Sequence, residues 1–296
     1  MSSWFATTEA DTSAVEEAPW QRALTVCVVT TTLALLLDFC LVRRIVPDGA
    51  RYFVCHACFN TWLTCVVLSD SLEALQNPSQ ALLGDDKGGW ADSAVVTTAG
   101  ITGFHVYHML AFKGISAEDW VHHLVSCVLV PIIGVGCPFG RVVSVSNLGM
   151  CGIPGGIDYA LLAGVKLGVV PRMAEKSINS MLNLLLRWPL MLLSTYLFGL
   201  GWLNGTLAGA SARGAQLWVR FLMAVAVLLH TANAAYYAQK VIGNAHVTAA
   251  KEREARATKK QDSPPPRTDA FPISEERKRE MVTSGSSGDF KDFTCD

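Results

Sequence analysis

Long apolar stretches separated by short polar ones make up most of this chain. We expect seven membrane-spanning helices, at about 22–42, 53–73, 94–112, 119–136, 141–166, 177–200 and 216–241. Each stretch could cross a hydrocarbon core of ~30 Å at ~1.5 Å of helix per residue. The pattern therefore predicts an all-α fold, a polytopic transmembrane helical bundle of about seven spans.

Two of these spans are weaker than the others. The second contains polar residues, and the fifth is interrupted by Gly152, Pro154, Gly155 and Gly156. Such an interruption predicts a kink or a pair of half-helices in the fifth span. A six-span bundle with a re-entrant fifth segment is the alternative.

Composition agrees with a membrane protein. Of the 296 residues, 51% are hydrophobic and 17% are charged, and the mean hydropathy is +0.32. A net charge of -1, without a basic patch interleaved with aromatics, argues against a nucleic-acid partner. Cys55, His56 and Cys58 have metal-like spacing, but no second pair completes a zinc site, so we expect these cysteines to pack as small hydrophobes.

Loop charges predict the orientation. Basic residues follow the first, third, fifth and seventh spans, whereas the loop 74–93 and the N-terminus are acidic. By the positive-inside rule, 1–21 is a lumenal N-terminal segment, 22–245 is the transmembrane domain, and 246–296 is a disordered cytosolic tail. The sequon at Asn204 falls in a loop that this topology makes lumenal, so it is a candidate glycosylation site.

The most informative motif opens the fourth span. Asp119, His122 and His123 are spaced i, i+3 and i+4, so on a helix they share one face, which Ser126 extends. Titratable groups inside a bilayer usually have a function. These three side chains are therefore the first candidates for a site.

Other spans carry polar stripes at helical spacing. They are His105 with His108, Asn147 with Cys151 and Asp158, Asn179 with Asn183 and Arg187, and His230 with Asn233 and Tyr237. Because such stripes cannot all face lipid, we expect them to face one another. They predict a polar chamber that opens toward the cytosol, with Arg187 near mid-membrane.

Structural alternatives exist for several of these residues. The asparagines 179, 183 and 233 and the pair His105 and His108 could join helices, and His230 could be a hydrogen-bonded packing residue. Arg187 could pair with an acidic group or with helix C-terminal carbonyls.

The order of these elements resembles the TLC domain superfamily, which includes the ceramide synthases. The resemblance begins with Asp119, His122 and His123 at the start of a span, which a Gly-rich span follows. It continues with Arg187-Trp188-Pro189 and ends with the polar and aromatic residues from Asn233 to Tyr237. The resemblance covers roughly 50–245. It implies a helical bundle in the endoplasmic reticulum or another endomembrane, with a lumenal N-terminus and a cytosolic C-terminus.

In the ceramide synthase branch the two histidines are needed for N-acyl transfer from acyl-CoA. The resemblance therefore implies that His122 and His123 are catalytic, and that Asp158 matches a family acidic position. His108 stands where those synthases commonly have an aspartate, and the connection from Lys113 to Glu118 is short. The chain thus looks like a divergent member of the superfamily.

We expect an acyltransferase that acts on a lipid amine or hydroxyl, with acyl-CoA as co-substrate and no bound cofactor or metal. One imidazole would act as a base or attack the thioester, and the other, or Asp119 or Asp158, would fix its tautomer. His105, His108 and Arg187 would bind the substrate. The partners would be membrane lipids and further subunits of a homo- or hetero-oligomer.

The alternative is a non-enzymatic protein that senses lipids or regulates membrane composition. A di-iron lipid hydroxylase is disfavoured because its site needs about eight ligands, and the chain has 7 histidines. A retinal receptor needs a lysine inside its last span, where Lys240 stands only at the end.

Overall fold

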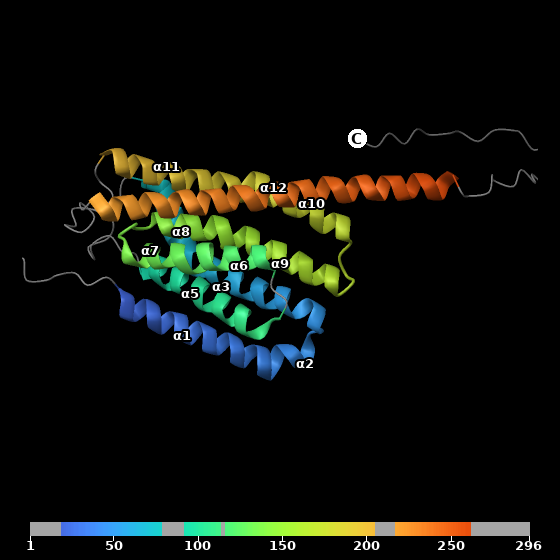
Figure 1. The fold of residues 1–296 in the computed structure, drawn as a ribbon, viewed down its shortest axis with the longest axis horizontal. Coiled ribbons are helices and arrows are strands. Elements are labelled where there is room, and N and C mark those ends of the chain that lie inside the picture. The colour runs from blue at the N-terminus through green and yellow to red at the C-terminus, as the bar shows by residue number, and fades with distance from the viewer. Residues whose placement is uncertain (1–18, 79–91, 114–115, 205–216, 262–296) are drawn as a thin grey trace, which may run out of the picture. The chain divides into compact units, whose positions relative to one another are not determined.

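The computed structural model describes residues 19–78, 92–113, 116–204 and 217–261 (Figure 1). Within these residues every regular element is helical, which confirms the all-α expectation. The α-helices are α1 (Trp20–Leu37), α2 (Arg43–Ile45), α3 (Asp48–Gln76), α5 (Asp92–Ala111), α6 (Ala117–His122), α7 (Val130–Gly136), α8 (Val142–Asn147), α9 (Ile153–Lys166), α10 (Arg172–Leu182), α11 (Trp188–Asn204) and α12 (Leu217–Gln261).

Six helices are long and apolar enough to span a membrane. They are Trp20–Ile45, Asp48–Gln76, Ala117–Gly136, Val142–Lys166, Arg172–Leu203 and Leu217–Thr258. The chain is therefore an integral multi-pass membrane protein.

The helix α5 is absent from this set, although we expected the second and fifth spans to be the weakest. More than half of its residues are buried in the bundle, including Thr97, Thr98 and His108. A helix enclosed by other helices does not need an apolar surface toward lipid, which explains its more polar composition.

Short π-helical segments interrupt four of the spans. The one in the first span, Asp38–Val42, has no proline close behind it, whereas the other three each end two residues before a proline. These three segments are His123–Leu129 before Pro131, Leu148–Gly152 before Pro154, and Asn183–Arg187 before Pro189. Proline cannot donate to the carbonyl four residues earlier and clashes with it, so the preceding turn widens. The break expected around Pro154 is thus present as a π-helical turn rather than as a pair of separated half-helices.

Apolar side chains hold the bundle together in separate clusters. One lies among α7, α11 and α12, around Phe139, Phe198 and Met223. A second lies between α3 and α5, around Phe59 and Phe104, whose rings stack with centroids 4.3 Å apart. Neither cluster includes the histidines of the motif, so these polar side chains gather elsewhere in the bundle.

The last helix is longer than the sequence indicated. α12 continues past residue 245, where we placed the start of a disordered tail, and ends at Gln261. Alanine and alternating charges in this stretch are good helix formers, which explains the extension. Contacts divide the chain into two units after Thr248, close to the predicted domain boundary.

Candidate active site

Five of the chain's histidine rings lie together inside the bundle. His56 comes from α3, His105 and His108 from α5, and His122 and His123 from the start of the fourth span. The ring centroid of His123 lies 4.7 Å from that of His108, 5.3 Å from that of His105 and 5.4 Å from that of His122. His56 joins the group with its centroid 5.5 Å from that of His108.

Helix geometry fixes the tautomer of most of these rings. In a helix the carbonyl oxygen four residues earlier lies within reach of Nδ1, which must then carry the proton and donate it. This arrangement occurs in His56 with Tyr52 (3.0 Å), His105 with Ile101 (2.8 Å), and His123 with Asp119. Nε2 of each ring is consequently left as the acceptor.

His122 reaches the same tautomer through another helix. Its Nδ1 donates to Oδ1 of Asn233 in α12, at 3.0 Å. Its Nε2 lies 3.8 Å from the Sγ of buried Cys127, which is at most a weak donor. His122 therefore has a fixed orientation and a ring nitrogen with an available lone pair.

His108 and His123 form a direct pair. Because Nδ1 of His123 donates to a backbone carbonyl, its Nε2 must accept, and Nδ1 of His108 donates to it at 3.0 Å. Both rings are buried. The pair can pass a proton from one imidazole to the other.

The histidines line a polar cavity of ≈ 510 Å³, which we call the chamber. It collects every catalytic or binding candidate that the sequence suggested: His105, His108, Asp119, His122, His123, Asp158 and Arg187. It also contains residues that the sequence did not suggest, namely Tyr52 and Tyr159. Tyr52 stands four residues before His56, and this spacing could have indicated it.

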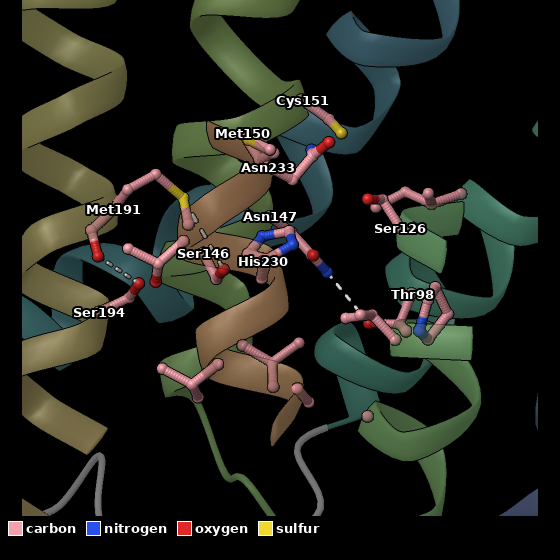
Figure 2. A pocket seen from close by; sticks show the side chains of 18 of the residues that line it. Thr98, Ser126, Ser146, Asn147, Met150, Cys151, Met191, Ser194, His230 and Asn233 are labelled. Atoms are coloured by element: carbon pink, nitrogen blue, oxygen red, sulfur yellow. Dashed lines mark hydrogen bonds between the residues drawn. The ribbon is translucent and has the colours of Figure 1, made fainter. Parts of the chain in front are cut away.

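A second cavity of ≈ 120 Å³, the apolar pocket, adjoins the chamber (Figure 2). Figure 2 shows Met191 and Ser194 on one side of it and Thr98 and Ser126 on the other. The two cavities share His105, His122 and Asn233, among other residues. The free nitrogen of His122 thus belongs to a side chain at the junction between a polar and an apolar space.

A groove of ≈ 470 Å³ runs between the start of the fourth span and α12, and we call it the lateral groove. It is lined by the exposed side chains of Val121 and Tyr236, and it also reaches His122 and Asn233. Glu118 lines one end of it and bonds Tyr236 and Lys240. Because apolar side chains such as Val121 are exposed along the rest, the groove is suited to admit a lipid from the side.

The two candidate aspartates are placed differently from our expectation. Ser116 is the N-cap residue of α6, and its hydroxyl accepts from the backbone N–H of Asp119. The carboxylate of Asp119 in turn accepts a hydrogen bond from that hydroxyl at 2.7 Å, and only its backbone carbonyl holds His123. Asp158 accepts from Asn179 at 2.6 Å. Among the described residues neither carboxylate bonds a histidine ring. Asp119 instead fixes the tautomer of His123 through its backbone carbonyl, and that of His122 is fixed by Asn233.

Asparagines and a histidine outside the motif had also been given structural roles as alternatives, and the structure agrees with some of these roles and not with others. Asn179 joins α9 to α10 through Asp158, as expected of a residue that links helices. Asn233 also links helices, but its partner is His122. His230 was expected to be hydrogen-bonded, yet both ring nitrogens are buried without a partner in the described residues, and the ring lines the apolar pocket.

His105, His122 and Cys127 could also hold a metal ion. One ligand atom from each lies within 4.8 Å of the others, and both histidines have Nδ1 bound to a carbonyl oxygen. That orientation is common for zinc-binding histidines, and two histidines with one thiolate are a known zinc set. The free nitrogen of His122 is therefore suited to act either as a base or as a metal ligand.

The candidate glycosylation site lies at the edge of the described residues. Asn204 is the last residue of α11, and the remainder of its sequon lies outside the described residues.

No family model, no curated protein and no solved structure matches the chain.

Proposed function

We propose that the chain is an enzyme of lipid metabolism that transfers an acyl chain from acyl-CoA to the amine or hydroxyl of a membrane lipid. One observation carries the proposal: His122, with its tautomer fixed by Asn233, lines the chamber, the apolar pocket and the lateral groove. An acyl tail, a polar acceptor and a route from the lipid would therefore meet at a single basic nitrogen.

The reaction needs a base at this junction. Nε2 of His122 takes the proton from the N–H or O–H of the acceptor, and the acceptor atom attacks the thioester carbonyl carbon. The carbon–sulfur bond breaks, and coenzyme A leaves as a thiolate. The imidazolium of His122 then returns the proton to the thiolate, so the histidine ends in its starting state.

His123 and His108 support this chemistry from the chamber side. Their direct hydrogen bond gives a second imidazole unit that can hold or pass a proton near the acceptor. The resemblance to the TLC domain superfamily favours the same two histidines of the motif, His122 and His123, as the catalytic pair.

We further propose an endomembrane location, most simply the endoplasmic reticulum, with a lumenal N-terminus and a cytosolic C-terminus. The basic loops and the sequon at Asn204 support this orientation. Glycosylation of Asn204 agrees with it, whereas a C-terminal tail that is accessible only from the lumen contradicts it.

Substitution of the two histidines tests the proposed activity. In cells that lack the protein, His122→Ala and His123→Ala should fail to restore the lipid profile, with turnover in nanodiscs at least ~100-fold below wild type. His246→Ala is the matched control, because His246 is exposed on α12 and does not line the chamber. If both variants restore the lipid profile as well as wild type does, the proposal fails.

The same purified protein separates the competing functions. Lipid binding without turnover by wild-type protein would indicate a non-enzymatic lipid sensor. A stoichiometric zinc or iron content that His105→Ala and Cys127→Ser remove would make His122 a metal ligand and exclude its role as the base.

A further inference from the structure

A line of hydrogen bonds connects Arg187 to Asp158 through two asparagines. Nη1 of Arg187 donates to Oδ1 of Asn183 at 2.8 Å, Nδ2 of Asn183 donates to Oδ1 of Asn179 at 2.9 Å, and Nδ2 of Asn179 donates to Oδ1 of Asp158 at 2.6 Å. Asn179 and Asn183 are buried, so water does not compete for these bonds. The guanidinium of Arg187 is therefore held in one orientation.

This arrangement leaves part of the guanidinium without an acceptor. Nε of Arg187 is buried and has no hydrogen-bond partner in the described residues. Asp158 attracts the guanidinium electrostatically, but it is joined to it only through the two asparagines. A buried donor without a partner is unfavourable by roughly 1–3 kcal/mol, and more when the group is charged. Because Nη1 is taken by Asn183 and Nε is closed off from the cavity, Nη2 remains as the donor for an anionic oxygen that enters the chamber.

The position of Arg187 identifies which oxygens these would be. Arg187 lines the chamber, and Met191, one turn later, lines the apolar pocket. Arg187 thus stands where the polar space gives way to the apolar one, and His122 also lines both spaces. An acyl chain whose first carbons enter the apolar pocket would have its carbonyl carbon in this region.

We propose that Arg187 binds an anionic oxygen on the first carbon of an acyl chain. This inference rests on the proposed function in one respect, since in acyl transfer that oxygen is the oxyanion formed when the acceptor attacks the thioester. When no reaction takes place, a fatty acid presents an anionic oxygen at the same carbon, as part of its carboxylate. The substrate class of the apolar pocket is accordingly an acyl chain rather than a neutral alcohol or sterol.

The charges around the chamber agree with a single anion site at this place. Asp119 and Asp158 also line the chamber and disfavour an anion placed beside them. Asp158 interacts electrostatically with Arg187, so it offsets part of the charge of that arginine. Lys113 is the other basic residue among the described lining residues, and it is exposed just beyond the end of α5. Arg187 is therefore the basic group that can meet an anion at the inner end of the chamber.

Binding of two ligands that differ only in their head group tests the inference. The probes are palmitic acid, at alkaline pH where it is ionised, and hexadecanol, both offered to the purified full-length protein in phosphatidylcholine nanodiscs. Wild type should bind palmitate about tenfold more tightly than hexadecanol, the size expected of charge-assisted hydrogen bonds. Arg187→Gln should remove this difference, and Arg187→Lys should retain part of it.

Two controls distinguish loss of the anion site from damage to the pocket and from general attraction by positive charge. Lys113→Gln should preserve the preference for palmitate, and unchanged hexadecanol binding by Arg187→Gln shows that the pocket is intact. Equal binding of the two ligands by wild type, or an unchanged preference in Arg187→Gln, overturns the inference. Equal losses in the Lys113 and Arg187 variants also overturn it, because they indicate general attraction by positive charge.

The result is separable from that of the proposed function. His122→Ala should lose turnover yet keep the preference for palmitate. If no acyl transfer is found while the preference depends on Arg187, the proposed function fails and the anion site stands. If transfer requires His122 while Arg187→Gln keeps the preference, only the anion site fails.

Discussion

Asn233 provides the sharpest test of the proposed chemistry, because it touches His122 without being the base itself. Asn233→Leu removes the oxygen that accepts the Nδ1 proton of His122 at 3.0 Å, with little change in side-chain size. The ring is then free to carry its proton on Nε2, and in that tautomer the nitrogen cannot accept a proton from the acceptor lipid. Asn233 is thus predicted to be a positioning residue.

The size of the effect follows from this one bond. A net hydrogen bond of roughly 0.5–1.5 kcal/mol corresponds to a loss of at most about tenfold in the population of the active tautomer. Loss of ring orientation adds to this, and comparable partners of functional histidines are worth ~10–100-fold. We expect the kcat of Asn233→Leu to fall about 10–100-fold, with KM little changed.

Acyl transfer by purified variants in nanodiscs measures this effect. Asn233→Asp, which keeps an acceptor oxygen, should recover most of the activity, and Asn244→Leu, at an exposed position further along α12, should behave as wild type. A double variant with His122→Ala should be no slower than His122→Ala alone, since both changes act through one ring. Full activity in Asn233→Leu, or a further loss in the double variant, would refute the role assigned to Asn233.

Two further predictions concern stability and the motif. Gly103→Ala places a Cβ 2.4 Å from the carbonyl oxygen of Cys27, so α1 must move away from α5, and thermal unfolding should show a loss of ~1–3 kcal/mol. Gly199→Ala, with no atom within 4 Å of its Cβ, should be as stable as wild type or more so, and equal behaviour of the two variants would contradict the close packing. Asp119→Asn should keep turnover within about threefold and lower stability by at most ~1 kcal/mol, because its carboxylate supports the N-cap residue Ser116 in the first turn of α6 while its carbonyl holds His123. A loss above about tenfold in turnover would place that carboxylate in the reaction.

The π-helical segments show which structural features could be predicted from local sequence. The break around Pro154 was predicted, since proline disrupts the hydrogen-bond pattern of its own helix. The equivalent segments before Pro131 and Pro189 follow from the same rule. They include His123 and Arg187, so the widened turns contribute to where these side chains lie.

The extent of the helices was predicted less well than their existence. Apolar periodicity located the spans because a helix in contact with lipid requires an apolar surface. The helix α5 is enclosed by other helices, so it does not need such a surface, and it is absent from the six candidate spans. The extension of α12 to Gln261 was missed because charged residues were interpreted as a tail, although they are compatible with a helix.

The sequence by itself determined the helical class, the approximate spans, and the shared face of Asp119, His122 and His123, since each depends on the repeat of a single helix. It also indicated that the polar stripes meet. Only the tertiary structure decided that His122 is oriented by Asn233, a residue 111 positions away, and that the carboxylate of Asp119 binds the hydroxyl of Ser116 instead of a histidine ring. Hydrogen-bond partners between helices depend on their relative rotation and depth, which the packing of the whole bundle sets and which no local pattern records.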